Sequence, residues 1–303
     1  MPKIRWFEFK AYSGIAITGD EPVTIMDRGL HMDRAVWLTS QLEAPKYGSV
    51  QGYDGAGISG GLLHNVAVLP KTMEQGDLWK LVRRALDAVA LVKGDPPAIS
   101  ALLAANFWTI TPDGILRTTA GVKVSGQAIR DVVSPPNGRV PKSGAQYSQA
   151  LAWAGALSAL FSSRPEAKLA QKVYAAEWLA QGRSVVELPV YWAFTGNLAV
   201  DSPIGLPAAS LPAEVDLAMC VYHSFSVNAP APAAKALEGV TVNPANPVSF
   251  GTTLIRRLGK TAFGRWTDEP GDGNNRYDRT RRAVWKSDLW DSAMVRRLMP
   301  RDL

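Results

Sequence analysis

The chain has few residues that support disulfide or metal chemistry. It contains one cysteine and three histidines in 303 residues. A single cysteine excludes an intrachain disulfide, and Cys220 lies in the apolar run of residues 215–221, which predicts a small core residue. His31, His64 and His223 are scattered and show no metal-ligand spacing. We therefore expect no metal and no cofactor, and histidines that are packed or lie at the surface.

Long apolar runs are also absent. No segment approaches the roughly 20 apolar residues needed to cross a bilayer. The amino-terminal MPKIRWFEFKAYSG is interrupted by Arg5, Glu8 and Lys10, so it lacks the apolar region of a secretory signal. We expect a protein that is synthesised in the cytoplasm without a signal peptide and has no membrane partner. If its target lies outside the cytoplasm, release or particle delivery must bring it there.

Basic charge is present in excess, and it gathers near the carboxyl end. The formal net charge is +6, and residues 251–303 hold 12 Lys and Arg against 7 Asp and Glu. The densest part, residues 276–282, is followed by Trp285 and Trp290. Arg with interleaved aromatics is one pattern of nucleic-acid binding, but the acidic residues among them favour a solvated helical face. We expect attraction to an anionic polymer and no nucleic-acid partner.

Apolar spacing predicts mainly helices with a small β element near the front. One helix is expected over residues 33–42 with Asp33 as its cap, and another after Asp77, ending before Gly94. A hairpin is expected at residues 107–117, and the Pro/Ala-rich residues 229–234 resemble a joint. Further helices are expected over residues 149–161, 166–180, 214–222, 249–258 and 276–298. The predicted class is α+β, mainly α, with an extended arm at residues 1–26 and one domain at residues 27–303.

The glycine-rich segment YDGAGISGG, residues 53–61, fits the G-x-G-x-x-G pattern of dinucleotide-binding loops through Gly55, Gly57 and Gly60. That motif needs a buried strand before the first glycine and a helix after the last. The preceding residues are polar and glycine-interrupted, and Pro70 closes the apolar stretch that follows. The dinucleotide interpretation is therefore weak.

The same segment fits a second motif, the G-x-S-x-G nucleophile elbow, with Ser59 at its centre. The elbow places the serine between a strand and a helix, with an acid and then a histidine later in the chain. His223 follows Asp201 and Asp216 in that order, but no apolar strand leads into Gly57. The elbow remains a lesser alternative.

A third interpretation begins upstream of the glycines, at Glu43. This residue ends the first predicted helix, where the helix dipole disfavours negative charge and raises the pKa of a carboxyl group. Asp54 follows eleven residues later in an Asp-Gly turn, a hairpin signal. Two carboxyl groups that flank a groove are the catalytic groups of most glycoside hydrolases. Ser59 is placed to hold the attacking water. The competing interpretation is that a glutamate after a helix and an Asp-Gly turn are ordinary structural features.

Residues 43–61 resemble the catalytic region of the lysozyme-like superfamily, especially phage-type muramidases and the related chitosanases. Their signature runs from a Glu through a Tyr to Asp-Gly-x-Gly-x-Ser/Thr. The resemblance implies a lysozyme-like helical domain with a small β-hairpin lining a saccharide cleft. The interval from Glu43 to Asp54 is shorter than in the chitosanases, and Ala56 stands where they usually carry a charged residue. The resemblance also implies roles for individual residues: Glu43 as general acid, Asp54 as second carboxylate, Ser59 as the residue that holds the attacking water, and Tyr47, Tyr53, Gly57 and Gly60 as substrate-binding residues.

Charge selects among the substrates of this superfamily. Peptidoglycan carries carboxylates on its stem peptides, whereas chitosan is a polycation, so a chain with a sequence pI near 9.4 is attracted to the first. We expect a bacteriolytic, peptidoglycan-degrading muramidase that acts on the cell wall. Residues 222–230 and 299–303 are similar to stretches of phage and contractile-injection-particle proteins, which makes such proteins candidate partners. The alternatives are a non-catalytic structural or wall-binding component of such a particle, and a chitosanase.

Replacing Asp54 with asparagine is expected to reduce the rate of glycan cleavage strongly while the fold is preserved. An exposed hairpin carboxylate contributes little to stability, whereas the second carboxylate is needed to activate water or to stabilise the transition state. Turnover of purified sacculi together with the melting temperature measures both effects. An unchanged rate would mean that another acid, such as Glu74 or Asp77, holds the second position.

Overall fold

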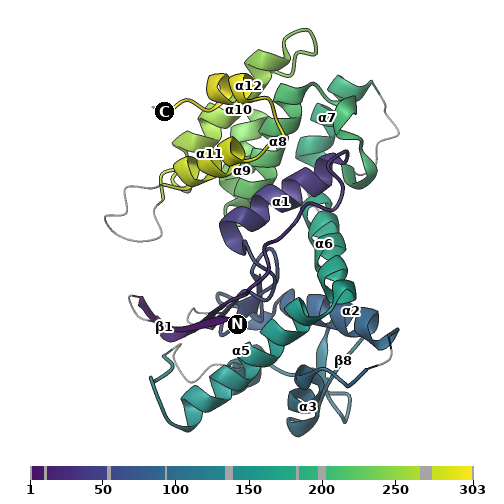
Figure 1. Ribbon diagram of the computed structural model, residues 1–303, viewed down its shortest axis with the longest axis vertical. Coiled ribbons are helices and arrows are strands. Elements are labelled where there is room, and N and C mark those ends of the chain that lie inside the picture. Colours follow the sequence, from purple (N-terminus) through teal and green to yellow (C-terminus); the bar gives the residue numbers. More distant parts are fainter. Residues whose placement is uncertain are drawn as a thin grey trace. The chain divides into compact units, whose positions relative to one another are not determined.

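The computed structural model describes residues 2–9, 12–52, 56–92, 94–133, 139–181, 184–196, 203–266 and 275–301. It is mainly helical with small antiparallel sheets, which confirms the predicted α+β, mainly α class (Figure 1). The chain divides into unit 1, Met1–Val23 and Glu43–Tyr174, and unit 2, Thr24–Leu42 and Ala175–Leu303. The domain predicted at residues 27–303 includes residues of both units. Among the described residues, no helix is long and apolar enough to span a membrane.

Unit 1 contains a five-stranded antiparallel sheet. Its strands follow chain order: β1 (Lys3–Phe9), β2 (Tyr12–Thr18), β3 (Val50–Gly52), β4 (Ser59–Gly60) and β5 (Asn65–Val66). The alternation at Ile15 and Ile17 buries both isoleucines, because alternate residues of a strand point to the same face. Most of the predicted amino-terminal arm is therefore a hairpin, and Ile17 pairs with Val50 of β3.

The helices of unit 1 surround a core rich in tryptophan. The Trp153 ring centroid lies 6.2 Å from that of Trp79 and 6.0 Å from that of Trp108, and all three side chains are buried. The predicted hairpin at residues 107–117 is confirmed as β8 (Trp108–Ile110) and β9 (Leu116–Thr118). The other elements are α2 (Leu78–Ala90), α3 (Ala98–Ala105), α4 (Gly126–Val133), α5 (Ala145–Ser163), the first part of α6 (Pro165–Ala180), and the strand pair β6 (Val68–Leu69) and β7 (Glu74–Gln75).

Gly61 follows β4 at a place where both conformation and space require glycine. Its φ is +79°, and an added Cβ would lie 2.4 Å from Leu81 Cδ2. We expect Gly61→Ala to lower the free energy of unfolding by about 3 kcal/mol, combining left-handed strain with overpacking. Gly121→Ala is the matched control, since φ is +84° but nothing lies within 4 Å of the added Cβ. Urea denaturation should show the larger loss for Gly61→Ala, and equal losses would contradict the packing argument.

Unit 2 is built around one buried helix, α8 (Ala213–Ser226), in which every residue from Val215 onward is buried. It packs against α9 (Pro230–Glu238) and α10 (Pro247–Lys260) (Figure 1). Burial on all sides explains why residues 215–221 are apolar except for Asp216 and why Cys220 is a core residue, as predicted. The remaining elements are α1 (His31–Glu43), up to Leu42, the last residues of α6, α7 (Ser184–Thr195), the 3-10 helices η2 (Pro203–Gly205) and η3 (Ala208–Ser210), α11 (Arg276–Lys286) and α12 (Ser292–Leu298).

Two helix boundaries differ from the prediction. The helix expected to start behind Asp33 begins at His31, and the Asp33 carboxylate instead accepts a hydrogen bond from the Asp27 amide at 3.0 Å. The single helix expected over residues 276–298 is two helices, because Asp291 caps α12 by accepting from the Met294 amide at 2.8 Å. Trp290 lies in the break, and its indole N–H donates to the buried Asp216. In a continuous helix, the direction of the Trp290 side chain would be fixed by the helical repeat.

Candidate active site

Glu43 is the last residue of α1, at the helix end where the sequence placed it. Its side chain is 9 % exposed. No basic residue lies in the last turn of α1, but the Arg279 guanidinium of α11 donates to the Leu42 carbonyl at 3.1 Å. The carboxyl end of α1 therefore has a cationic donor that the sequence did not predict, which partly offsets the negative end of the helix dipole.

His64 contacts Glu43. Its Nδ1 lies 3.8 Å from Glu43 Oε2, within ion-pair distance, and its side chain is 14 % exposed. His64 closes the turn that begins at Gly61, donating its backbone N–H to the Gly61 carbonyl at 3.1 Å. Its φ is +50°, in the left-handed region that few residues other than glycine adopt. The turn after β4 thus returns an imidazole to the carboxyl group at the end of α1.

Asp54, Tyr53 and Gly55 lie outside the described residues. The strands on either side of them are described, and they pair antiparallel, with Val50 opposite Gly60 and Gln51 opposite Ser59. The expected hairpin is thus present in its two strands, β3 and β4. The role of Asp54 as second carboxylate stays a prediction, as does substrate binding by Tyr53.

Ser59 and Tyr47 are packed inside unit 1. Ser59 is 2 % exposed and its Oγ lies 3.5 Å from the Gln51 carbonyl oxygen, and Tyr47 is 1 % exposed. The ammonium groups of Lys168 and Lys172 lie 5.6 and 5.7 Å from the centre of the Tyr47 ring, which favours cation–π attraction. Both residues act here as packing groups, and their predicted contacts with water and substrate stay predictions.

Gly57 and Gly60 have structural reasons to be glycine. The φ of Gly57 is +79°, and a Cβ on Gly60 would lie 3.2 Å from a ring carbon of Phe161 in α5. Close approach of β4 to α5 accounts for Gly60 without a bound sugar. The residues after Gly60 form a turn and then β5, so no helix follows the glycines. This excludes both the dinucleotide loop and the nucleophile elbow, because each needs a helix at that place.

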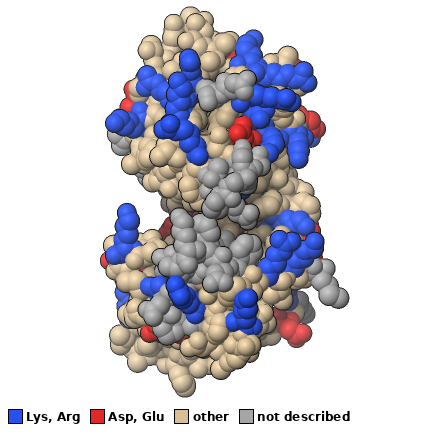
Figure 2. Space-filling model, turned by 90° about the vertical axis from the view of Figure 1, so that its left-hand side faces the viewer, with Lys and Arg blue, Asp and Glu red and all other residues tan. Residues whose placement is uncertain are grey.

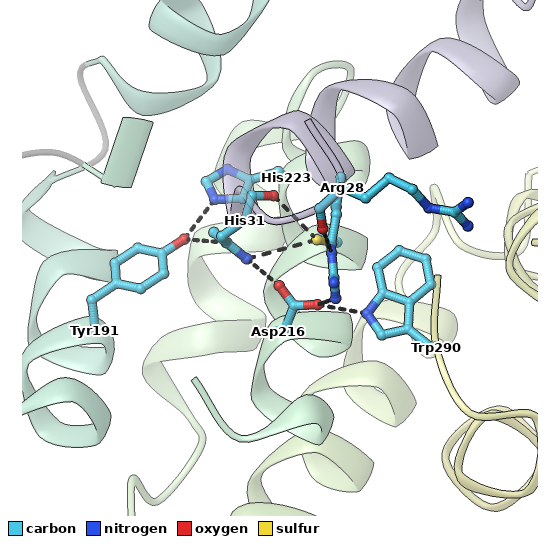
Figure 3. Close-up of polar contacts among 8 residues, drawn as sticks. Arg28, His31, Tyr191, Asp216, His223 and Trp290 are labelled. Atoms are coloured by element: carbon cyan, nitrogen blue, oxygen red, sulfur yellow. Dashed lines mark hydrogen bonds and ion pairs between the residues drawn. The ribbon is translucent and has the colours of Figure 1, made fainter. Parts of the chain in front are cut away.

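A second polar cluster lies in the core of unit 2, and the sequence did not predict it (Figure 3). Asp216 of α8 accepts hydrogen bonds from His31 Nδ1 at 2.7 Å, Arg34 at 2.8 Å and Trp290 at 2.6 Å. Burial raises the pKa of Asp216, but the His31 hydrogen bond, the charges of His31 and Arg34, and the Trp290 hydrogen bond together lower it below 3.8. Asp216 is therefore ionised at neutral pH and ties α1, α8 and the segment before α12 together.

The cluster continues from His31 through Tyr191 of α7. The Tyr191 hydroxyl lies 3.0 Å from His31 Nε2 and 2.8 Å from His223 Nε2, and His223 Nδ1 lies 3.8 Å from a Glu187 carboxylate oxygen. Burial first, and then the Glu187 charge, raise the pKa of Tyr191 far above 10, so the phenol keeps its proton. One hydroxyl proton serves one imidazole, so the other imidazole must donate to the hydroxyl oxygen. Of the two Nε2 atoms, one therefore accepts the Tyr191 hydroxyl proton, and the other carries a proton and donates it to the hydroxyl oxygen.

Three side chains of this cluster have ligand atoms close enough together to coordinate one metal ion. Those of His31, Asp216 and Cys220 lie within 4.8 Å of one another. Both oxygens of Asp216 already accept hydrogen bonds, one of them from the cationic Arg34. Burial also raises the pKa of the Cys220 thiol well above 9, which opposes the thiolate that a metal requires. The side chains of His31, Tyr191, Asp216 and His223 are fully buried, so we interpret the cluster as a hydrogen-bonded core that no substrate reaches.

Comparison with protein-family models, curated proteins and solved structures finds no match for this chain. The lysozyme-like resemblance therefore depends on residues 43–61 and on the geometry around Glu43.

Proposed function

We propose that the chain is a peptidoglycan-degrading glycoside hydrolase of the muramidase type, with Glu43 as its general acid. The observation that carries the proposal is the position of Glu43. It is a carboxyl group, 9 % exposed, at the end of α1, and it is followed in the chain by the antiparallel strands β3 (Val50–Gly52) and β4 (Ser59–Gly60). A helix-end glutamate followed by a β-hairpin is the arrangement that the resemblance implies.

The proposed reaction needs a proton at the glycosidic oxygen and a negative charge near the sugar ring. The protonated Glu43 carboxyl group donates to the leaving oxygen as the bond breaks, because an alkoxide is a poor leaving group at neutral pH. Asp54, in the connection between β3 and β4, supplies the second carboxylate. It activates water or stabilises the oxocarbenium-like transition state.

Surface charge supports an anionic substrate. Lys and Arg side chains are spread over the face shown in Figure 2, and Asp and Glu are sparse on it. A hollow of about 670 Å³ between α9 and α10 of unit 2 is lined by Lys235, Arg257 and Lys260 and by no acidic residue. Cationic surfaces raise the local concentration of anionic polymers such as peptidoglycan, and they repel chitosan.

Digestion of purified bacterial sacculi tests the proposal. We expect soluble muropeptides that carry new reducing sugar ends and intact stem peptides, identified by liquid chromatography and mass spectrometry. Chitosan should be cleaved more slowly than sacculi. Binding to sacculi without release of fragments would instead favour the non-catalytic wall-binding component, and faster cleavage of chitosan would favour a chitosanase.

A further inference from the structure

We propose that His64 is a positioning residue for Glu43, contacting its carboxyl group and setting the pH at which it loses its proton. This inference rests on the proposed role of Glu43. Sequence spacing marked His64 as an ordinary packed or surface histidine, and the resemblance assigns it no role.

The first support is geometric. His64 Nδ1 and Glu43 Oε2 are 3.8 Å apart, and both side chains are largely buried, at 14 % and 9 % exposure. Burial limits screening by water, so when His64 is protonated and Glu43 is ionised the two groups attract each other more strongly than a surface pair would. The contact also joins two elements, the end of α1 and the turn that follows β4.

The second support is the backbone of His64. Its positive φ of +50° is a conformation that asparagine, aspartate and histidine adopt more readily than most residues other than glycine. Residues held in such conformations cluster at functional sites. Here the left-handed residue is also the one that contacts the proposed acid, so the turn geometry and the side-chain contact point to the same role.

Two uncharged side chains lie beside the turn that carries His64. Leu81 of α2 and Gln171 of α6 lie beside Gly61, at the start of the turn, and neither is charged. Several charged side chains on these two helices contact other groups. Arg83 pairs with Asp87, Arg84 lies over the Tyr174 ring, and Lys168 and Lys172 lie over the Tyr47 ring, with Lys168 also paired to Glu21.

The expected consequence for pH dependence has a definite sign. A cationic imidazole favours the ionised carboxylate, so the pair makes Glu43 release its proton at a lower pH than it would alone. Without His64, Glu43 keeps its proton to higher pH. The alkaline limb of kcat/KM, which reports the acid in the free enzyme, should then move upward by about 1 pH unit.

The matched variant is His64→Asn, because asparagine also tolerates positive φ and carries no charge. We expect the upward shift of the alkaline limb on sacculi, together with about a tenfold lower maximal rate from the less fixed carboxyl group. His64→Gly, which relaxes the backbone, should show the same shift. An alkaline limb that stays in place in both variants would overturn the inference.

An imidazole titration by NMR separates this inference from the proposed function. The chain has three histidines, and the His64 signal is assigned as the one that disappears in His64→Asn. In Glu43→Gln the His64 midpoint should fall by about 1 pH unit, because the carboxylate no longer stabilises the imidazolium. An unchanged midpoint contradicts the ion pair. If Glu43→Gln retains full activity, the proposed function fails, whatever the titration shows.

Discussion

Asp216→Ala is expected to lower the free energy of unfolding of unit 2 by about 3–5 kcal/mol, the cost of removing one partner of a buried charge pair. Three donors converge on this carboxylate, from His31, Arg34 and Trp290. The substitution leaves these donors without an acceptor in a core where His31 is fully buried. Loss of paired hydrogen bonds, rather than loss of apolar area, dominates the effect.

Cys220 provides a reporter confined to unit 2. It is the one cysteine in the chain and is fully buried. A thiol reagent reaches it only when the surrounding helices open, so its rate of labelling reports their opening free energy. The expected destabilisation corresponds to labelling about 100 to 1000 times faster, at about 1.4 kcal/mol per factor of ten. Asp288→Asn is the control, because it removes an exposed ion pair with Arg28 and should change the rate little. Equal labelling rates in both variants would contradict the role of Asp216.

The same variant has a predictable pH dependence. The pKa of Asp216 is lowered in the folded protein from its ordinary value of 3.8. A lowered carboxyl pKa stabilises the fold at pH values above the unfolded pKa, and this contribution is lost as the pH falls through the folded pKa. The difference in stability between wild type and Asp216→Ala should therefore be constant near neutral pH and narrow below about pH 4. If this difference in the free energy of unfolding narrowed near pH 6 instead, the histidines and not Asp216 would account for it.

Glu43→Gln is expected to reduce the rate of sacculus cleavage by about 10²–10⁴-fold, the usual contribution of a general acid. Glutamine has nearly the same shape as glutamate but has no proton to give to the glycosidic oxygen. The fold should be preserved, since glutamine fills the same space at the end of α1. Glu21→Gln is the matched control, because Glu21 is an exposed carboxylate in the same unit. A similar loss in both variants would show that the effect is not specific to Glu43.

Local patterns in the sequence were sufficient to predict much of the helical content. The helix after Asp77 is confirmed as α2, and Pro165 begins α6, since their apolar stripes and first-turn residues are local features. The prolines that suggested a joint at residues 229–234 instead begin α9, because proline is tolerated in the first turn of a helix. Pro189 lies inside α7, where tertiary packing outweighs its low helix propensity.

The polar contacts could be predicted less well than the helices. Glu43 was identifiable because its position depends on one helix end. His64 was not, since its importance depends on a turn that brings it back to a residue 21 positions earlier. Asp216 and His31 are 185 positions apart and meet only in the folded core. A polar residue in an otherwise apolar run, such as Asp216 among residues 215–221, is the pattern that could have indicated a buried network.

The most direct test of the central claim, that Glu43 donates the proton in glycan cleavage, compares two leaving groups. Wild type and Glu43→Gln are assayed on a natural oligosaccharide of the glycan strand and on the same oligosaccharide with a dinitrophenyl leaving group, which departs without a proton. We predict that the ratio of the two enzymes' rates is large on the natural bond and near unity on the activated one. The same ratio on both substrates would contradict the assignment of Glu43 as general acid.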